Sequence, residues 1–366
     1  MSTLQITRLS VRDLRVIHAI DLEPSPSLNL ISGDNGQGKT TLLEAIYLVA
    51  TSRSFRTHRL REAIARDAEA LSVRATMSQA DQRYEQFIAV SSAERVLKLN
   101  DNKPPNTAEY ATRSPVVVFH PAEVALTAGP ASLRRTLLDR VALFLKPSDY
   151  AHAGAYLHAM KARHRLLITQ GPSSPALDSY EALMARHGAL LTSVRAQAAQ
   201  LLLEATAQAL RTLGPGTLAF HGFYQPGGSQ EPAELLQQLR ERRARDARRA
   251  SAGFGPHLDD LVLQLGGQAA RVVASQGQHR LLTLAIKIGE TVCVEQATGT
   301  RPVLLLDDVS SELDAERTDA LFSFLANSNN QVFVTTTRPE MVARLQAGVV
   351  GTRWFAMRSG QIAAAP

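Results

Sequence analysis

Two short motifs of the kind that hold phosphate and metal lie near opposite ends of this 366-residue chain. Residues 33–40 read Gly-Asp-Asn-Gly-Gln-Gly-Lys-Thr and fit the phosphate-loop pattern G-x-x-x-x-G-K-S/T. Residues 303–308 read Val-Leu-Leu-Leu-Asp-Asp, an apolar strand that ends in two carboxylates. If both motifs serve one nucleotide, the nucleotide-binding parts come from both ends of the chain. We therefore expect an inserted lobe between them.

The phosphate loop has the local context that its chemistry needs, because residues 27–31 form an apolar strand before it and residues 41–50 an apolar helix after it. Glycines allow the backbone N–H groups to point inward at phosphates, and the helix N-terminus favours an anion. We expect Lys39 to reach the β and γ phosphates of ATP and Thr40 to ligand Mg²⁺. The expected nucleotide contacts are Gly33, Asp34, Asn35, Gly36, Gln37, Gly38, Lys39, Thr40 and Thr41.

The two acids at the end of residues 303–308 predict the metal and catalytic groups. Asp307 would hold Mg²⁺, directly or through water, and Asp308 would be the base that orients an attacking water. Lys39 and Asp308 are thus the expected catalytic residues. Two acids at a strand end can also cap the following turn, and the phosphate loop is what favours the metal site over that alternative.

Residues 274–278, Ala-Ser-Gln-Gly-Gln, stand before a predicted helix and before the acidic strand, where the signature sequence of ABC-type ATPases lies. A serine hydroxyl and glycine amides at a helix N-terminus form an anion site, so Ser275, Gly277 and Gln278 are candidate nucleotide contacts. Ser275 as a simple helix cap is the alternative. Residues 311–314 resemble the D-loop, in which Asp314 would line a dimer seam or cap a helix.

Hydrophobic periodicity predicts an α/β fold with three parts. Residues 1–120 are the N-terminal part of an ATPase lobe, residues 121–250 an inserted helical lobe, and residues 251–366 the C-terminal part of the ATPase lobe. The expected strands are residues 4–11, 16–22, 27–31, 71–77, 84–90, 96–99, 116–119, 261–265, 303–306 and 331–335, with a strand pair near 355. The expected helices are residues 41–50, 133–213 with a break at 171–175, 231–250, 278–296 and 314–325.

Composition narrows the setting of the protein. Lys and Arg outnumber Asp and Glu by 40 to 34, and the pI of about 9.7 favours a polyanionic partner. Because Cys293 is the only cysteine, the chain can form neither an intramolecular disulfide nor a Cys-paired zinc site. A single cysteine is consistent with a reducing compartment. The sequence has no apolar run near the ~18 residues of a membrane span and no signal-like start. We expect a cytoplasmic protein.

Basic side chains gather at several places that could contact DNA phosphates. The candidates are Arg53, Arg56, Arg59, Arg134, Arg135, Arg242, Arg245 and Arg249, and a further cluster holds Lys161, Arg163 and Arg165. Arg242, Arg245 and Arg249 follow three- and four-residue spacing on one face of the helix 231–250. The alternative for each cluster is a solvated helix face neutralised by acids, such as Glu241 and Asp246. No groove-reading motif is present, so sequence-specific binding is not expected.

These motifs together resemble the head of ABC-type DNA-repair ATPases, and further blocks resemble the RecF family. The blocks are residues 36–40 with 43–47, 52–56, 129–130 with 134–135 and 138–139, 255–257 with 259–260, 275–278 and 305–314. They occur in order, at family spacing, over nearly the whole chain. The departures are Thr41, Ala122, Leu258 and His279, and Thr336-Thr337 stand where many ABC transporters have a sensor histidine.

The resemblance implies an ATP-gated homodimeric clamp in DNA repair and replication restart. Each phosphate loop would face the partner's Ser275 segment, and hydrolysis would be slow. DNA with gaps or single-strand to double-strand junctions would be the substrate, and RecR and RecO would be partners in loading RecA. A role in the SOS response is also implied.

Three other functions have to be weighed. The cytoplasmic ATPase of an ABC transporter shares the nucleotide motifs, but usually has the sensor histidine. An ATPase fused to a nuclease needs more than the roughly fifty residues that follow Asp314. A helical scaffold with a degenerate site would not need intact Lys39, Thr40, Asp307 and Asp308.

Overall fold

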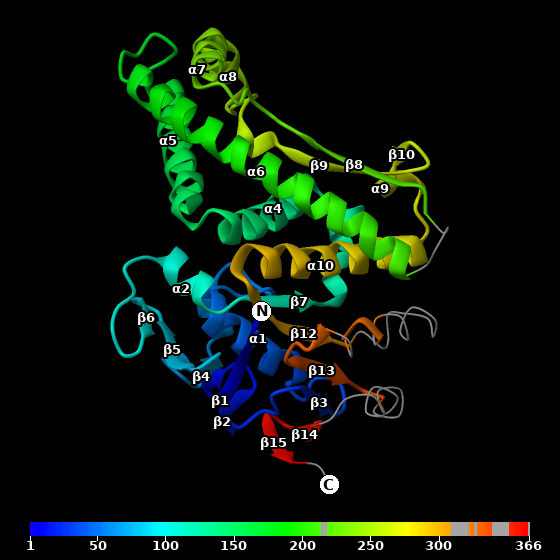
Figure 1. Cartoon of the computed structure of the whole chain (residues 1–366). Helices are drawn as coiled ribbons and strands as arrows, with labels where there is room; N and C mark the ends of the chain where they lie inside the picture. Colours follow the sequence, from blue (N-terminus) through cyan, green and yellow to red (C-terminus); the bar gives the residue numbers. More distant parts are fainter. Residues whose placement is uncertain (214–217, 309–320, 322, 326–327, 339–350, 365–366) are drawn as a thin grey trace. The chain divides into compact units, whose positions relative to one another are not determined.

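The computed structural model describes residues 1–213, 218–308, 321, 323–325, 328–338 and 351–364, and it forms two compact units (Figure 1). Unit 1 comprises Met1–Glu123, Ala209–Pro215 and Arg280–Pro366, and unit 2 comprises Val124–Gln208 and Gly216–His279. Unit 1 is thus assembled from both ends of the chain, as the two motifs require.

A largely parallel sheet carries the motifs of unit 1, in the strand order β15-β14-β3-β13-β12-β7. The strands are β3 (Leu28–Ser32), β7 (Val116–Phe119), β12 (Val303–Asp307), β13 (Val332–Thr336), β14 (Arg353–Arg358) and β15 (Gln361–Ala364). β12 pairs in parallel with β7 on one side and β13 on the other, and only β15 runs antiparallel. Every residue of β12 is buried, which is typical of a parallel strand covered on both faces.

A second, mainly antiparallel sheet of unit 1 has the order β11-β1-β4-β5-β6, with β2 beside β1. Its strands are β1 (Ser2–Leu14), β2 (Ile17–Leu22), β4 (Ala70–Gln79), β5 (Gln82–Ser91), β6 (Arg95–Leu99) and β11 (Thr300–Arg301). Helix α1 (Lys39–Thr51) contacts strands of both sheets and is buried along most of its length. Its side chains join one apolar core with both sheets. Helix α2 (Thr107–Arg113) leads into β7.

Unit 2 is mainly helical but contains a small sheet that the sequence did not predict in full. Its helices are α3 (Ala125–Ala128), α4 (Ala131–Leu145), α5 (Tyr150–Thr169), most of α6 (Leu177–Leu213), α7 (Pro232–Glu241), α8 (Arg243–Arg249), α9 (Ala270–Val273) and the start of α10 (Gln276–Thr298). Its sheet has the order β10-β9-β8, from β8 (Phe220–Gln225), β9 (Asp260–Leu265) and β10 (Gln268–Ala269).

Three boundaries differ from the expectation. The expected interruption at 171–175 is present between α5 and α6, but the stretch before it is two helices, because α4 ends at Leu145 and α5 begins at Tyr150 after a short turn at Pro147–Asp149. The expected helix 231–250 is two helices that meet at Arg242. Unit 2 continues to His279 instead of ending near residue 250, because β9 pairs antiparallel with β8 inside this unit.

Three further expectations concern Cys293, membrane-spanning helices and residues 311–325. Cys293 is buried, in keeping with a core position. Among the helices that the structure describes, none combines the length and apolar character of a membrane span. The expected helix 314–325 and the D-loop residues 311–314, including Asp314, lie outside the described residues, apart from the last few residues of that helix.

Candidate functional site

The phosphate loop connects β3 to α1 and is pressed against β14. Gly33 has φ +154°, and a Cβ there would lie 2.4 Å from the Met357 carbonyl oxygen. Gly38, with φ +110°, is the N-cap of α1, and a Cβ there would lie 2.9 Å from the Met357 side chain. Only glycine fits both the backbone conformation and the space at these positions. The loop's close approach to β14 therefore explains two of its three glycines.

The side chain of Lys39 is held over the phosphate loop by carbonyl oxygens of the loop. Its side-chain Nζ donates to the carbonyl oxygens of Gly33 at 2.8 Å and of Asp34 at 2.9 Å. Burial lowers the pKa of the ammonium group, and the nearby carboxylates of Asp308 and Asp307 act against that shift. The sequence-predicted cation and both predicted carboxylates therefore share one electrostatic environment.

Thr40 and Asp307 come together from the two ends of the chain. The Thr40 hydroxyl lies 2.8 Å from one carboxylate oxygen of Asp307 and 2.9 Å from the other. A hydroxyl and a carboxylate are hard oxygen donors of the type that Mg²⁺ prefers. This donor set fits the metal that the two motifs predict.

Thr335 is a site residue that the sequence reasoning missed. Its hydroxyl donates to Asp307 Oδ1 at 2.7 Å and accepts from the Asp308 backbone N–H at 3.0 Å. Thr335 lies opposite Asp307 in the parallel register of β12 and β13. Many ABC transporters have a sensor histidine just after this strand, whereas here the hydroxyl of Thr335, at the strand end, bonds the predicted metal carboxylate of Asp307. Only the register between the strands reveals it.

A cavity of about 300 Å³ opens at this loop. It is lined by Arg15, Val16, Asn35, Gly36, Gly38, Lys39, Thr40, Thr41, Arg56 and Asp308. Six of these residues are predicted nucleotide contacts, and Asp308 is the predicted base. Three cationic side chains in one wall suit a polyphosphate. The predicted contacts Gly33, Asp34 and Gln37 belong to the same loop, although they do not line the cavity.

Two of the cavity arginines are anchored by Glu44, a fully buried residue of α1. Arg15 donates to the Glu44 carboxylate at 2.6 and 2.9 Å, and Arg56 donates at 3.1 Å. The hydrogen bond to Glu44 raises the pKa of Arg15. Ser54 donates a further bond of 2.6 Å to the same carboxylate. Arg56, a sequence candidate for DNA contact, thus has a place in the wall of the phosphate cavity.

The Ser275 segment forms a reciprocal helix cap in unit 2. Gln278 N–H donates to Ser275 Oγ at 3.2 Å, and Ser275 N–H donates to Gln278 Oε1 at 2.8 Å. This is a capping-box arrangement, so the helix-cap interpretation holds at Ser275. Gly277 lies in the first turn of α10. A cap does not exclude an anion site at the same helix end, because the cap uses only some of the free N–H groups.

Two basic candidates from the sequence lie inside unit 2. Arg134 is only 5% exposed and makes a two-bond ion pair with Asp260 at 2.7 and 3.0 Å. Arg163, from the further cluster, is 1% exposed. These residues cannot present their guanidinium groups to DNA, and the DNA-contact prediction for Arg134 is wrong. The sequence shows the charge of each arginine but not the acids that pair with it in the fold, which are Asp260 for Arg134 and the buried Glu181 and Asp246 for Arg163.

The other basic candidates differ in their surroundings. Arg135 is half-buried and donates to the Asp259 carbonyl oxygen at 2.7 Å. Burial also lowers the pKa of Arg135. Arg53 and Arg59 are exposed, and Arg59 lies 3.8 Å from Glu62.

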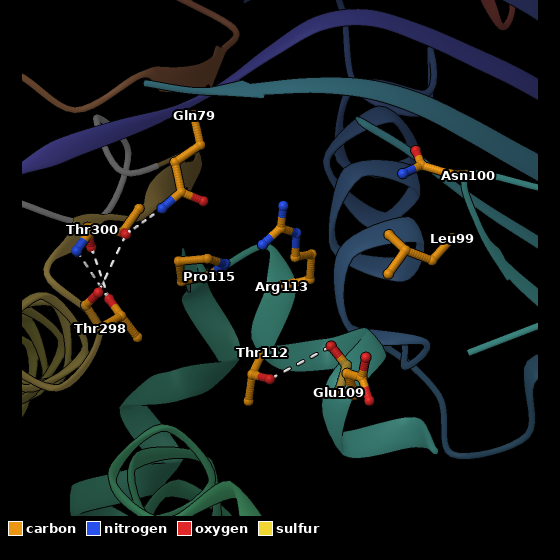
Figure 2. A pocket seen from close by; sticks show the side chains of 9 residues that line it. All are labelled: Gln79, Leu99, Asn100, Glu109, Thr112, Arg113, Pro115, Thr298 and Thr300. Carbon is orange, nitrogen blue, oxygen red and sulfur yellow. Dashed lines mark hydrogen bonds between the residues drawn. The ribbon is translucent and has the colours of Figure 1, made fainter. Parts of the chain in front are cut away.

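A larger cavity of about 420 Å³ lies elsewhere in unit 1, and it contains none of the predicted site residues (Figure 2). Its lining comprises Gln79, Leu99, Asn100, Glu109, Thr112, Arg113, Pro115, Thr298 and Thr300. Several of its polar groups are already bonded within the protein. Gln79 donates to Thr300 Oγ1 at 2.7 Å, for example, and Arg113 donates to Gln82 at 3.0 Å. The smaller cavity, where the phosphate loop meets Asp308, is therefore the candidate functional site.

Comparisons with known proteins show which family the chain belongs to. A family model described as "RecF/RecN/SMC N terminal domain" matches residues 5–354. The DNA replication and repair protein RecF of Syntrophotalea carbinolica is 32% identical over 361 residues, which cover 98% of each chain. The protein of the same description from Myxococcus xanthus is 35% identical over 373 residues, covering 98% of this chain and 97% of the relative.

Solved structures show the same fold. The recombination mediator protein RecF with ATP, described as part of the RecFOR pathway, superimposes with a TM-score of 0.89 at 28% identity, covering 100% of this chain and 98% of that chain. The Smc head domain from Pyrococcus furiosus gives a TM-score of 0.55 at 15% identity, covering 99% of this chain and 96% of that chain, and shows the fold alone. The expected P-loop ATPase head with an inserted helical lobe is confirmed.

Proposed function

Because this chain belongs to the RecF family, we propose that it is an ATP-dependent DNA-binding protein of recombinational repair and replication restart. ATP-Mg²⁺ would join two copies into a clamp on gapped or junction DNA, and slow hydrolysis would release it. The observation that carries the proposal is that Lys39, Thr40 and Asp308 line one cavity, with Asp307 bonded to Thr40 beside it. ATP supplies the phosphoanhydride bond whose cleavage resets the clamp.

The phosphate loop and its arginines would bind the triphosphate. Lys39, Arg15 and Arg56 bring three cationic groups to the cavity wall, and the glycine-rich backbone supplies N–H donors. Glu44 keeps the two arginines in place through bonds of 2.6 to 3.1 Å. Held in this way, the guanidinium groups need little reorganisation to meet the charge of the nucleotide.

Mg²⁺ would be held by Thr40 and Asp307, with Thr335 fixing the carboxylate. Asp308 would accept a proton from water at the γ phosphate. Strand β13 ends in the hydroxyl side chains of Thr335 and Thr336, near where a transporter ATPase would have its sensor histidine. We associate that difference with slow turnover, which suits a timed clamp better than a motor.

Dimerisation would complete the site from the second copy. In the proposed clamp, the N-terminus of α10 with Ser275, Gly277 and Gln278 faces the γ phosphate bound by the partner, and Asp314 lines the seam. The Ser275–Gln278 cap supports this role because it fixes the backbone that would present the anion site. ATP would thereby control whether two DNA-binding surfaces act together.

The biological setting of the proposal comes from the relatives. Their description as DNA replication and repair proteins, and the RecFOR pathway of the solved structure, support a role beside RecR and RecO in loading RecA onto single-stranded DNA. Support of the SOS response belongs to the same proposal.

The nucleotide part is tested by ATP binding and turnover of Lys39→Ala and Asp308→Asn. We expect Lys39→Ala to lose most ATP-Mg²⁺ binding and Asp308→Asn to bind ATP but turn over roughly 10²-fold or more slowly, as for loss of a general base. Measurement of binding with a fluorescent ATP analogue and of phosphate release separates the two effects. Equal binding and turnover in wild type and both variants would refute the assignment.

A further inference from the structure

The segment from α7 to α8 carries an unusual density of arginines. They are Arg240, Arg242, Arg243, Arg245, Arg248 and Arg249. Arg243 bonds Glu181 and Asp178, the latter at 2.8 Å, and Arg240 lies 3.3 Å from Asp178. These two arginines therefore have acidic partners within unit 2. The surroundings of the other four, Arg242, Arg245, Arg248 and Arg249, differ from those of this pair.

The two acids in this segment, Asp246 and Glu241, already have bonding partners of their own. Asp246, the acid within α8, is only 2% exposed and accepts from the buried Arg163 at 2.8 Å. Glu241 accepts from Gln237 at 2.8 Å. Arg245, Arg248 and Arg249 are all exposed, and within the described part of the chain no ion pair involves them. The solvated, acid-neutralised face weighed from the sequence does not match this arrangement.

The break at Arg242 does not disturb the face that the arginines share. Arg242 has the turn-like angles φ −91° and ψ −2°, but its carbonyl oxygen accepts from Asp246 N–H at 2.8 Å, a helical i→i+4 bond that spans the break. The three- and four-residue spacing of Arg242, Arg245 and Arg249 therefore stays on one side. The Arg242 guanidinium rests 4.8 Å from the centre of the Phe254 ring.

Buried bonds hold this helix in place. Arg163 of α5 donates to Glu181 of α6, to Asp246 of α8 and to the Leu239 carbonyl oxygen of α7, each at 2.8 Å. One buried guanidinium thus ties four helices together. The exposed arginines stand on a fixed platform, so binding a ligand there requires ordering of side chains only.

We propose that Arg242, Arg245, Arg248 and Arg249 form a phosphate-binding face that contacts the backbone of duplex DNA. From Arg242 to Arg249 the helix rises about 10 Å at ~1.5 Å per residue, which matches about three phosphates at ~3.4 Å per strand. Guanidinium groups bind phosphate oxygens in pairs of hydrogen bonds, and no base-reading geometry is needed. This assignment rests on the proposed function, because it names the surface by which that DNA is held.

The test compares two double variants with the same charge change. Arg245→Gln/Arg249→Gln alters the proposed face, and Arg83→Gln/Lys103→Gln, at exposed residues of unit 1 outside every candidate DNA-contact cluster, is the control. Affinity for a gapped duplex is measured with ATP-Mg²⁺ from 50 to 300 mM salt. Since each lost phosphate contact lowers the slope of log affinity against log salt by about 0.9, we expect the first variant to lose about 2 units of slope and at least about tenfold in affinity near 100 mM salt.

The outcomes separate this surface from the wider function. The face is supported if only the Arg245/Arg249 variant loses slope and Arg245→Lys/Arg249→Lys restores it, because Lys also neutralises phosphate. Equal slopes in both Gln variants and wild type, with wild type binding DNA, would overturn the face and leave the clamp intact. If wild type itself fails to bind DNA with ATP-Mg²⁺, both proposals fall. Matching thermal transitions show that the variants are folded.

Discussion

The hydroxyl of Thr40 lies within hydrogen-bond distance of both carboxylate oxygens of Asp307, at 2.8 and 2.9 Å. These residues belong to opposite ends of the chain and meet because β3 and β12 flank β13 in one parallel sheet. The carboxyl ends of parallel strands share an edge, which is where ligands bind in such sheets. The strand order of unit 1 is therefore what brings the two proposed Mg²⁺ ligands together.

Thr335 provides a test of how the metal carboxylate is positioned. Thr335→Val keeps the size of the side chain but removes the bond of 2.7 Å to Asp307. We expect the Mg²⁺ concentration for half-maximal ATP hydrolysis to rise about 10- to 100-fold, because a hydrogen bond to a charged group contributes roughly 1.5–3 kcal/mol. Thr335→Ser restores the hydroxyl and should restore the Mg²⁺ dependence. An unchanged Mg²⁺ requirement in Thr335→Val would contradict the positioning role.

Glu44 tests the anchoring of the cavity arginines. Glu44→Gln removes the buried charge that Arg15 and Arg56 share, so we expect the free energy of unfolding to fall by about 2–4 kcal/mol and the affinity for ATP to decrease. Urea denaturation and ATP titration measure the two effects. Asp101→Asn, at exposed pairs with Lys98 and Arg74, is the control and should change stability by less than about 0.5 kcal/mol. Similar losses in both variants would show that Glu44 has no special role.

Arg163 is expected to act in stability and not in DNA contact. Arg163→Met leaves Glu181 and Asp246 buried without their shared partner, which should lower the free energy of unfolding by about 3–5 kcal/mol. The matched control, Arg165→Met, changes an exposed residue two positions away and should alter stability by less than about 0.5 kcal/mol. The urea midpoints decide between them. A stable Arg163→Met protein with weakened DNA binding would be the opposite of this prediction.

Histidine protonation should make the fold less stable on mild acidification. Burial lowers the pKa of His257, His187 and His279, so the unfolded chain takes up these protons at a higher pH than the folded chain. Stability should therefore fall as pH drops below about 6.5, the ordinary histidine pKa. Burial raises the pKa of Glu295, which acts in the opposite direction.

A variant separates these opposing contributions. His257→Asn should flatten the dependence of the free energy of unfolding on pH between 7 and 5, relative to wild type, because it removes one histidine whose pKa is lowered by burial. Urea denaturation across that range gives the slopes. A slope that is identical in the two proteins would show that His257 does not contribute.

The sequence was most informative where chemistry depends on neighbours along the chain. Gly33 to Thr40 and Val303 to Asp308 have local spacing that predicts a loop and a strand end, and both are where expected. Contacts that depend on register or on distant side chains were not predicted. Thr335 needed the pairing of β12 with β13, and the burial of Arg134 needed Asp260 from another element.

Helix boundaries show the same limit. The arginine-rich segment has helical periodicity throughout, yet α7 and α8 separate at Arg242, whose backbone has turn-like angles. Strand β8 was missed because its residues do not alternate apolar and polar: Gly222 lies on the less exposed face and Phe223 on the exposed one.

Sedimentation of the protein with gapped duplex DNA, with and without ATP-Mg²⁺, tests the clamp most directly, using wild type, Lys39→Ala and Asp308→Asn. We expect that ATP drives a wild-type dimer onto the DNA, that Lys39→Ala stays monomeric and weakly bound, and that Asp308→Asn remains as a long-lived dimer. An oligomeric state and DNA affinity that ignore nucleotide in all three proteins would contradict the clamp.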